Sequence, residues 1–302
     1  MLDTSPVISV KPIVLSAPQR GVDLQVRITA PFAGDQLPLV LFAHGFGKSF
    51  NDYAPLVDYW TAHGFIVVQP TFLDSRTLAI APDDPRTPDI WRWRVDDLVR
   101  VLDNLDTIVA AVPGLAGRAD PDRIVAAGHS WGATTASSLL GARVIGADGL
   151  PGEDMTDPRV RAGVLMALAG DGQQNLTPFA AEHFAFMSPE FSRMNAPALV
   201  VAGDADQSAL TTRGPDWWTD GYHRSPGEKA LLTLFGAEHS LGGIPGYAVT
   251  ETTDEDPARV ALLARVTTAF LGHVLGIEDA AWKREVAELS SAGHPKGVLV
   301  TE

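Results

Sequence analysis

Short apolar runs alternate with amphipathic stretches along most of the 302-residue chain. The runs are apolar at successive positions rather than alternate ones, which is typical of strands covered on both faces. We expect strands at residues 38–45, 64–71, 123–130, 162–170, 198–206 and 230–239. Two earlier segments, residues 6–18 and 22–31, predict an antiparallel hairpin. The pattern therefore predicts an α/β fold: a mostly parallel central sheet with helices on both faces and an antiparallel N-terminal edge.

Helical periodicity is clearest over residues 91–112, where Val95, Leu98 and Leu102 begin a run of apolar side chains at helical spacing. A second amphipathic stretch covers residues 261–276. Because no linker divides the chain, we expect a single domain over residues 1–302, with its core at about residues 31–276. The remainder, residues 277–302, suggests a short helix and a loose tail.

Charge and composition exclude several classes of function. The formal net charge of −14 argues against nucleic acid or an anionic membrane surface as the main partner. No apolar stretch reaches the length of a membrane helix, and the N-terminus lacks the pattern of a signal peptide, so we expect a cytoplasmic protein without membrane insertion. The absence of cysteine excludes disulfides, thiolate metal sites and a cysteine nucleophile.

The most specific motif lies in "AAGHSWGATTASSLL", residues 126–140. Its segment Gly128-His129-Ser130-Trp131-Gly132 matches G-x-S-x-G between a buried strand and a helical run, which is the context of a nucleophile elbow. A serine that caps a helix would also explain Ser130 alone. It would not explain why an aspartate and a histidine follow further along, each just after a predicted strand.

The aspartate has three candidates and the histidine one. Asp206 and Asp204 follow the strand at 198–206, Asp171 follows the preceding strand, and His239 follows the strand at 230–239. The order serine, aspartate, histidine is that of a hydrolase triad. We favour Asp206, because the chain has left the sheet there and can face the elbow, whereas Asp204 could brace its own turn.

A glycine turn after the strand at 38–45 allows two interpretations. Gly47-Lys48-Ser49 resembles the end of a phosphate-binding loop, but such a loop needs glycine where this chain has Phe42. Alternatively, the backbone N–H groups of Phe46 and of Trp131, next to the serine, form an oxyanion hole. We favour the oxyanion hole.

The segments "PLVLFAHGFGKSFNDY", "YWTAHGFIVVQP" and "GRADPDRIVAAGHSWGATTAS" resemble the α/β-hydrolase superfamily over roughly residues 31–275. Within it they resemble the chlorophyllase, dienelactone-hydrolase and platelet-activating-factor acetylhydrolase-like branch. The resemblance implies a serine carboxylic-ester hydrolase without metal or organic cofactor. It does not imply chlorophyll as the substrate, because plant-type members carry arginine where this chain has Trp131.

We therefore expect an esterase that acts on small or medium apolar acyl or aryl esters, polyesters and lipid esters included. An acyltransferase, a thioesterase or a lactonase would use the same three residues. Aromatic side chains in the loops after the strands favour an apolar substrate pocket, for which we name Phe72, Trp217 and Trp218. No spacing typical of a metal site is found.

Overall fold

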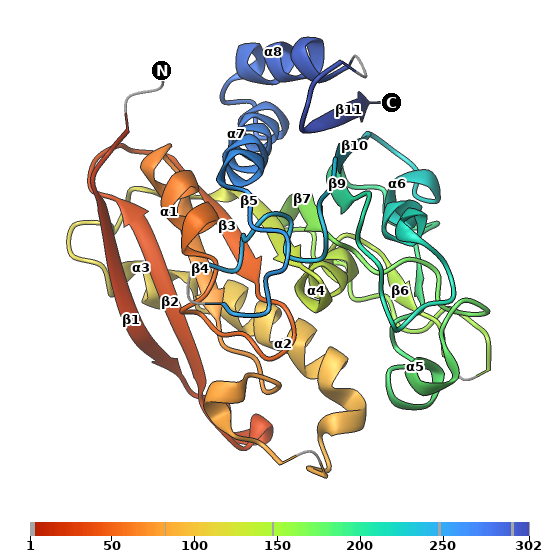
Figure 1. Cartoon of the computed structure of the whole chain (residues 1–302). Coiled ribbons are helices and arrows are strands. Elements are labelled where there is room, and N and C mark those ends of the chain that lie inside the picture. The colour runs from red at the N-terminus through yellow and green to blue at the C-terminus, as the bar shows by residue number, and fades with distance from the viewer. Residues whose placement is uncertain (1–3, 82, 147, 247–248, 291–292, 302) are drawn as a thin grey trace.

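The computed structural model describes residues 4–81, 83–146, 148–246, 249–290 and 293–301. Within them, a nine-stranded sheet has the order β1-β2-β4-β3-β5-β7-β9-β10-β11 (Figure 1). Its strands are β1 (Val7–Leu15), β2 (Leu24–Pro31), β3 (Leu37–Ala43), β4 (Ile66–Pro70), β5 (Ala119–His129), β7 (Val160–Met166), β9 (Ala198–Gly203), β10 (Lys229–Leu234) and β11 (Gly297–Thr301). The short strands β6 (Arg143–Val144) and β8 (Pro189–Glu190) pair separately.

The six predicted strands form the parallel centre of the sheet, from β4 to β10. The predicted hairpin is also confirmed, because β1 pairs antiparallel with β2, and β2 pairs antiparallel with β4. The prediction of a loose C-terminal tail is wrong. Residues 297–301 form β11, which pairs antiparallel with β10 and forms the opposite edge of the sheet. Strands from both ends of the described chain thus share one sheet, which favours the single-domain prediction.

The helices cover both faces of the sheet, as expected from its apolar strands (Figure 1). Their bounds are α1 (Ala54–Ala62), α2 (Ile90–Asp103), α3 (Leu105–Ala110), α4 (Trp131–Leu139), α5 (Pro178–His183), α6 (Asp220–His223), α7 (Pro257–Val274) and α8 (Asp279–Leu289). Short 3₁₀ helices cover Pro18–Arg20, Arg76–Leu78, Thr87–Asp89 and Pro215–Thr219. None of the helices within the described ranges is both long and apolar enough to cross a membrane.

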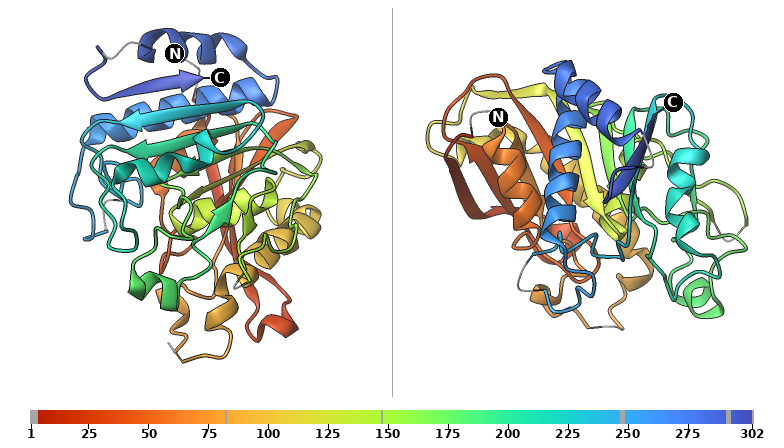
Figure 2. Two further views of the ribbon diagram at one scale, coloured as in Figure 1. Left: turned by 90° about the vertical axis from the view of Figure 1, so that its right-hand side faces the viewer. Right: turned by 45° about the horizontal axis from the view of Figure 1, so that its top comes forward.

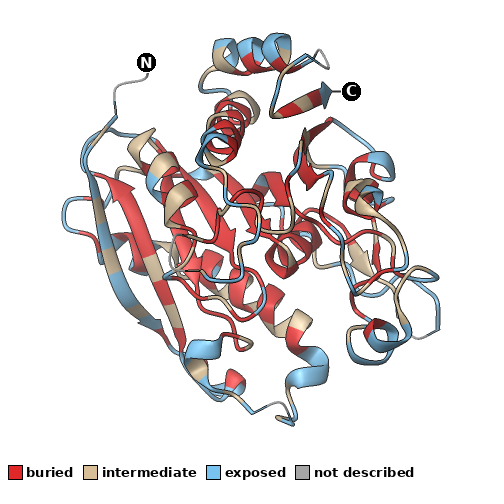
Figure 3. Ribbon diagram, viewed as in Figure 1, coloured by how far each residue is buried: buried red, intermediate tan, exposed pale blue. Residues whose placement is uncertain are grey.

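Alternate residues of each central strand feed two separate cores. In β3, Leu39 and Leu41 pack with α2, α3 and α4, whereas Val40 and Phe42 pack with α1, α7 and α8. Figure 3 shows the central strands buried and β1 partly exposed. In addition, α8 packs against α7 and β11 (Figure 2). The central strands are therefore fixed on both faces, and the loops at their C-terminal ends start from rigid positions.

The helix predicted at residues 91–112 is two helices, α2 and α3, separated at Asn104. The Asn104 side chain donates to the backbone oxygen of Arg100 at 2.8 Å, which satisfies a carbonyl at the end of α2. Asparagine and aspartate favour such local bonds, so they commonly interrupt a helix whose apolar pattern continues. Here the pattern continues with Ile108 and Val109, both buried.

Candidate active site

The serine motif forms a sharp turn between β5 and α4. Ser130 has φ 57° and ψ −123°, a backbone conformation that residues other than glycine rarely adopt. A Cβ atom at Gly128 would lie 2.2 Å from the backbone oxygen of Gly132, and one at Gly132 would lie 1.9 Å from that of Ala43. Only glycine fits at either position. The two glycines thus let the strand and helix approach closely enough to hold Ser130 at the turn.

The structure brings the predicted residues Ser130, Asp206 and His239 together, with His239 between the other two. Its Nε2 is 2.9 Å from Ser130 Oγ, and its Nδ1 is 2.8 Å from Asp206 Oδ2. A carboxylate only accepts, so Nδ1 carries the proton and Nε2 is free to accept from the serine hydroxyl. These three residues, the Ser–His–Asp cluster, come from the C-terminal ends of the parallel strands β5, β9 and β10, which lie at one edge of the sheet.

Asp206 is buried, with 1% of its surface exposed, and its carboxylate pairs with no arginine or lysine of the described residues. Its other carboxylate oxygen, Oδ1, has no hydrogen-bond partner among the described residues. The loop around it is fixed by Trp218, whose Nε1 donates to the backbone oxygen of Asp206 at 3.0 Å. The Asp206 charge is therefore left to interact with the imidazole of His239.

Asp204 braces the turn after β10 and not its own turn, which the sequence had suggested. Its Oδ1 accepts a hydrogen bond from the Gly236 N–H at 2.6 Å, in the turn after β10. That contact ties the loop of β9 to the loop of β10. Asp204 thus supports the loop that carries His239 without contacting the imidazole.

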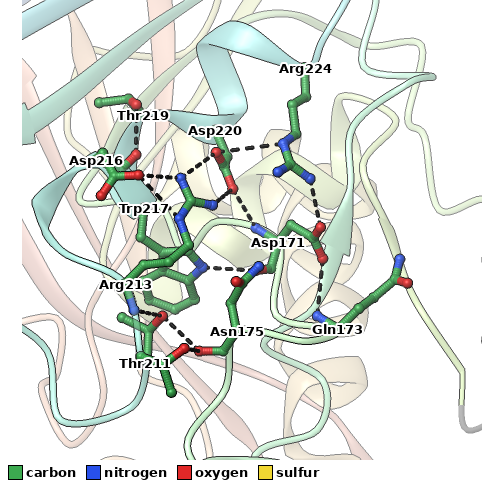
Figure 4. Close-up of polar contacts among 11 residues, drawn as sticks. Asp171, Gln173, Asn175, Thr211, Arg213, Asp216, Trp217, Thr219, Asp220 and Arg224 are labelled. Atoms are coloured by element: carbon green, nitrogen blue, oxygen red, sulfur yellow. Dashed lines mark hydrogen bonds and ion pairs between the residues drawn. The ribbon is translucent and has the colours of Figure 1, made fainter.

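Asp171 belongs to another group of charges, the arginine cluster, formed by Asp171, Arg213, Asp220 and Arg224 (Figure 4). Arg224 Nη1 lies 2.6 Å from Asp171 Oδ2, and Arg213 Nη1 lies 2.7 Å from Asp220 Oδ2. The backbone N–H of Asp171 also donates to Asp220 Oδ2 at 2.9 Å. Asp171 therefore joins two loops through arginines, and the structure does not bring it to His239.

The glycine turn, residues 44–47, lies beside Ser130, and most of its neighbouring N–H groups are already bonded. Gly45 N–H donates to Tyr53 Oη at 3.0 Å, Gly47 N–H to Asp74 Oδ2 at 3.1 Å, and Ser49 N–H to Asp52 Oδ2 at 2.7 Å. A phosphate would find few free amides here and would be repelled by two carboxylates. The phosphate-loop interpretation of Gly47-Lys48-Ser49 is therefore not supported.

Among the described residues, the N–H groups of Phe46 and Trp131 have no hydrogen-bond acceptor. Trp131 is the first residue of α4, where the helix leaves its initial N–H groups unpaired. Phe46 occupies the second position of a turn closed by the Lys48 N–H and the Gly45 oxygen at 3.2 Å. Both residues line the cleft above Ser130, and their rings pack together with centroids 4.5 Å apart.

Two buried histidines support the turn and the elbow. His44 Nε2 accepts from the Phe72 N–H at 3.0 Å, so its Nδ1 carries the proton and donates to the Gly45 oxygen at 2.7 Å. His129 lies 2.9 Å from Tyr53 Oη through Nδ1 and 2.7 Å from the backbone oxygen of His239 through Nε2. Burial lowers the pKa of each imidazole to about 3, so both are neutral.

Together, Tyr53 and His129 connect the glycine turn to the loop of His239. Tyr53 Oη accepts from Gly45 N–H and donates to His129 Nδ1, and His129 Nε2–H donates to the His239 carbonyl. Burial raises the pKa of the Tyr53 hydroxyl, which therefore stays protonated and able to donate. Sequence analysis missed Tyr53, because a tyrosine outside any motif gives no signal for such a contact.

The cleft around Ser130 has a volume of about 410 Å³. One part is apolar, with Phe46, Trp131, Phe184 and Leu210 in its lining. The other part is charged, because Lys48 and Arg76 both pair with Glu251 at the mouth, at 3.0 and 2.6 Å. The His239 side chain is 43% exposed, so solvent reaches the site. No cluster of metal-ligating side chains occurs in the described part of the chain.

The predicted pocket residues Phe72, Trp217 and Trp218 are wrong, because none of them lines the cleft. They are at most 2% exposed. Phe72 packs against His44, Trp217 donates to the Asp171 oxygen at 3.0 Å, and Trp218 packs on His239 with ring centroids 5.0 Å apart. Their rings are buried beneath the loops and form small cores there, as the large apolar side chains of a folded loop commonly do. The aromatic lining comes instead from Phe46, Trp131 and Phe184.

The sheet order, the elbow and the Ser–His–Asp geometry define the class of structure: the chain has an α/β-hydrolase fold. Residues 7–145 match the family model described as Chlorophyllase. The matched segment contains the glycine turn and the elbow and ends before Asp206 and His239. No curated protein matches the chain. The match supports a hydrolase of the α/β-hydrolase type.

Proposed function

We propose that this protein is a serine carboxylic-ester hydrolase with Ser130 as nucleophile, His239 as general base and acid, and Asp206 as the residue that orients the imidazole. The observation that carries the proposal is the continuous hydrogen-bond chain from Ser130 Oγ through His239 to a buried aspartate, at 2.9 and 2.8 Å. A structural serine at a helix start needs neither the histidine nor the strained φ of 57°.

In the first half of the reaction, Ser130 Oγ forms a bond to the ester carbonyl carbon while its proton passes to His239 Nε2. The carbonyl oxygen becomes an oxyanion, for which the free N–H groups of Phe46 and Trp131 are the donors. The C–O bond to the alcohol then breaks, and His239 gives the alcohol its proton. An acyl group remains on Ser130.

In the second half, water attacks the acyl carbon and its proton passes to His239. The carboxylic acid leaves as the proton returns to Ser130 Oγ. Asp206 stabilises the imidazolium in both halves, because no arginine or lysine in the described part of the chain neutralises its carboxylate. Solvent access to His239 favours hydrolysis over acyl transfer, since an acyltransferase must keep water away from the acyl group.

The apolar part of the cleft favours esters with an apolar acyl or aryl group. A panel of p-nitrophenyl esters of increasing chain length, with and without EDTA, measures this preference. We expect activity that EDTA leaves unchanged. A fluorophosphonate probe with peptide mapping tests the nucleophile, and we expect one adduct, on Ser130. An active protein labelled elsewhere, or not at all, would refute the serine mechanism.

A further inference from the structure

A buried ion pair lies directly behind the glycine turn. Arg94 of α2 and Asp74, in the loop after β4, are 2.6 Å apart between Nη1 and Oδ1, with side chains 1% and 4% exposed. The guanidinium also lies 4.1 Å from the centre of the Phe72 ring. Neither residue contacts the cleft, so the pair is not part of the site described above.

The two partners hold opposite ends of the glycine turn. Arg94 Nη2 donates to the backbone oxygen of His44, and Asp74 Oδ2 accepts from the N–H of Gly47 at 3.1 Å. Phe46, whose N–H has no acceptor in the described structure, lies between these two anchored positions. Although burial alone would raise the pKa of the Asp74 carboxyl, the charge of Arg94 holds it below its ordinary value. Asp74 therefore remains a carboxylate, the form that accepts strongly from Gly47.

Arg94 also reaches the other free N–H group, through Thr135. Its Nε donates to Thr135 Oγ1 at 3.0 Å, and the Thr135 hydroxyl donates to the backbone oxygen of Trp131 at 2.8 Å. One guanidinium is thus bonded to the segment that carries Phe46 and, through one hydroxyl, to the segment that carries Trp131. Because the guanidinium is planar and its N–H directions are fixed, it sets the distance between those segments.

We infer that Arg94, with Asp74, is a positioning residue that fixes the separation of the two oxyanion donors. The inference rests on the proposed function. A buried ion pair is no efficient source of stability, since apolar residues of similar volume often stabilise as well or better. An oxyanion hole, by contrast, requires donors placed to within a fraction of an ångström before the charge develops.

The chain offers a matched control in Arg20 and Asp97. They form a second buried pair, 2.9 Å apart between Nε and Oδ2, with side chains 0% and 2% exposed. Arg20 otherwise donates to backbone oxygens of Val22, Asp23 and Thr71 and does not contact the glycine turn. Replacing either arginine by lysine keeps the charge and removes the planar fork.

The test compares Arg94→Lys, Thr135→Val and Arg20→Lys with wild type. For each variant, kcat and KM on a p-nitrophenyl ester are measured together with the affinity for a trifluoromethyl ketone, which forms a tetrahedral oxyanion on the serine. We expect Arg94→Lys to lose about 10- to 100-fold in kcat, a loss bounded by the effect of removing one oxyanion donor. KM should change little, and inhibitor affinity should fall by a similar factor. Thr135→Val should show the same signature at about three- to tenfold.

Arg20→Lys should keep kcat and inhibitor affinity within about threefold, even if its thermal midpoint falls as far as that of Arg94→Lys. Equal kinetic losses in both lysine variants would reduce Arg94 to a structural role and overturn the inference, as would normal inhibitor affinity in Arg94→Lys. If Arg94→Lys does not fold, Thr135→Val decides the question. A wild-type protein with neither esterase activity nor a Ser130 adduct would overturn the proposed function itself, and the inference with it.

Discussion

The Ser–His–Asp cluster and the arginine cluster both follow strands of the same sheet, yet their aspartates have opposite surroundings. Asp220 is bonded to Arg213 at 2.7 and 3.1 Å and accepts a backbone N–H (Figure 4). The carboxylate of Asp206, a residue that is also buried, is bonded to the imidazole of His239, and its other oxygen has no partner in the described structure. A carboxylate neutralised by arginine has little charge left for an imidazolium. Exposure alone would not separate the two aspartates, whereas their partners do.

The largest expected effect is on catalysis at Asp206. Asp206→Asn removes the acceptor that keeps the Nδ1 proton on His239, so the imidazole can take the wrong tautomer. We expect kcat to fall at least about 100-fold while the fold is kept. Steady-state kinetics with circular dichroism provides the measurement.

The control for that change is Asp204→Asn, whose amide oxygen can still accept from Gly236, and we expect a loss of less than about threefold. If Asp204→Asn or Asp171→Asn proves the more damaging variant, the assignment of Asp206 is wrong, while Ser130 and His239 are unaffected.

Substitutions in the arginine cluster should lower the stability of the protein and not its catalytic rate. Asp220→Ala leaves the Asp171 N–H without its acceptor and leaves Arg213 paired with the exposed Asp216, and removing one member of a buried network costs about 2–4 kcal/mol. Urea unfolding measures the loss. The folded fraction should keep kcat within about threefold. A tenfold or larger drop in kcat at normal stability would show that the arginine cluster takes part in catalysis. The two clusters would then not differ in role.

Acid should lower the stability of the folded protein through His129, which is bonded to the loop of His239. The unfolded chain binds a proton on this imidazole below about pH 6.5, whereas the folded chain, with the pKa lowered by burial to about 3, does not. Unfolding therefore takes up a proton between these values, and stability falls as the pH falls, by about 1.4 kcal/mol per pH unit.

Urea unfolding of wild type and His129→Asn at several pH values isolates this effect, because other titrating groups such as His44 and Asp97 are common to both. The slope of stability against pH between about pH 4 and 6 should be smaller in the variant by close to one proton. Parallel slopes would show that His129 is protonated in the folded protein.

The smallest effect is expected at the rim of the arginine cluster. Asp216 lies 2.6 Å from Arg213, but its side chain is 65% exposed. Solvent-exposed pairs contribute little, so Asp216→Asn should change the free energy of unfolding by less than about 0.5 kcal/mol. A change as large as that of Asp220→Ala would mean that the exposure of these aspartates does not determine how much each contributes to stability.

The parallel strands could be predicted because strands covered on both faces are continuously apolar, and the elbow because its glycines are required by close backbone contacts. The turn with Phe46 and the helix start at Trp131 could be located because the turn follows a strand and the helix starts at the elbow, while their role as oxyanion donors stays a prediction. Strand β11 could not be predicted, since its five residues become a strand only through pairing with β10. The pocket prediction failed because, from sequence alone, an aromatic side chain in a loop can equally well line a cleft or be buried beneath the loop.

The positioning residues, Arg94 and Asp74, give only a weak signal in the sequence. Arg94 is spaced with Leu98 and Val101 on the apolar stripe of α2, and all three are buried. A charged residue on such a stripe needs a partner, because an unpaired buried charge is costly. Its partner, Asp74, follows a different strand, and nothing in the sequence spacing connects the two. The need for a partner could thus be inferred from sequence, but the partner itself required the structure.

Strand β11 also bears on how copies of this protein behave toward one another. The outer edge of β10 would otherwise present unpaired N–H and C=O groups, and such edges recruit strands from other molecules. The five residues Gly297–Thr301 occupy it along the whole of Lys229–Leu234 except its first residue. Since β10 leads directly into the loop of His239, a strand added there from another copy would lie next to that loop. Strand β11 therefore moves the open edge of the sheet one strand away from the loop of His239.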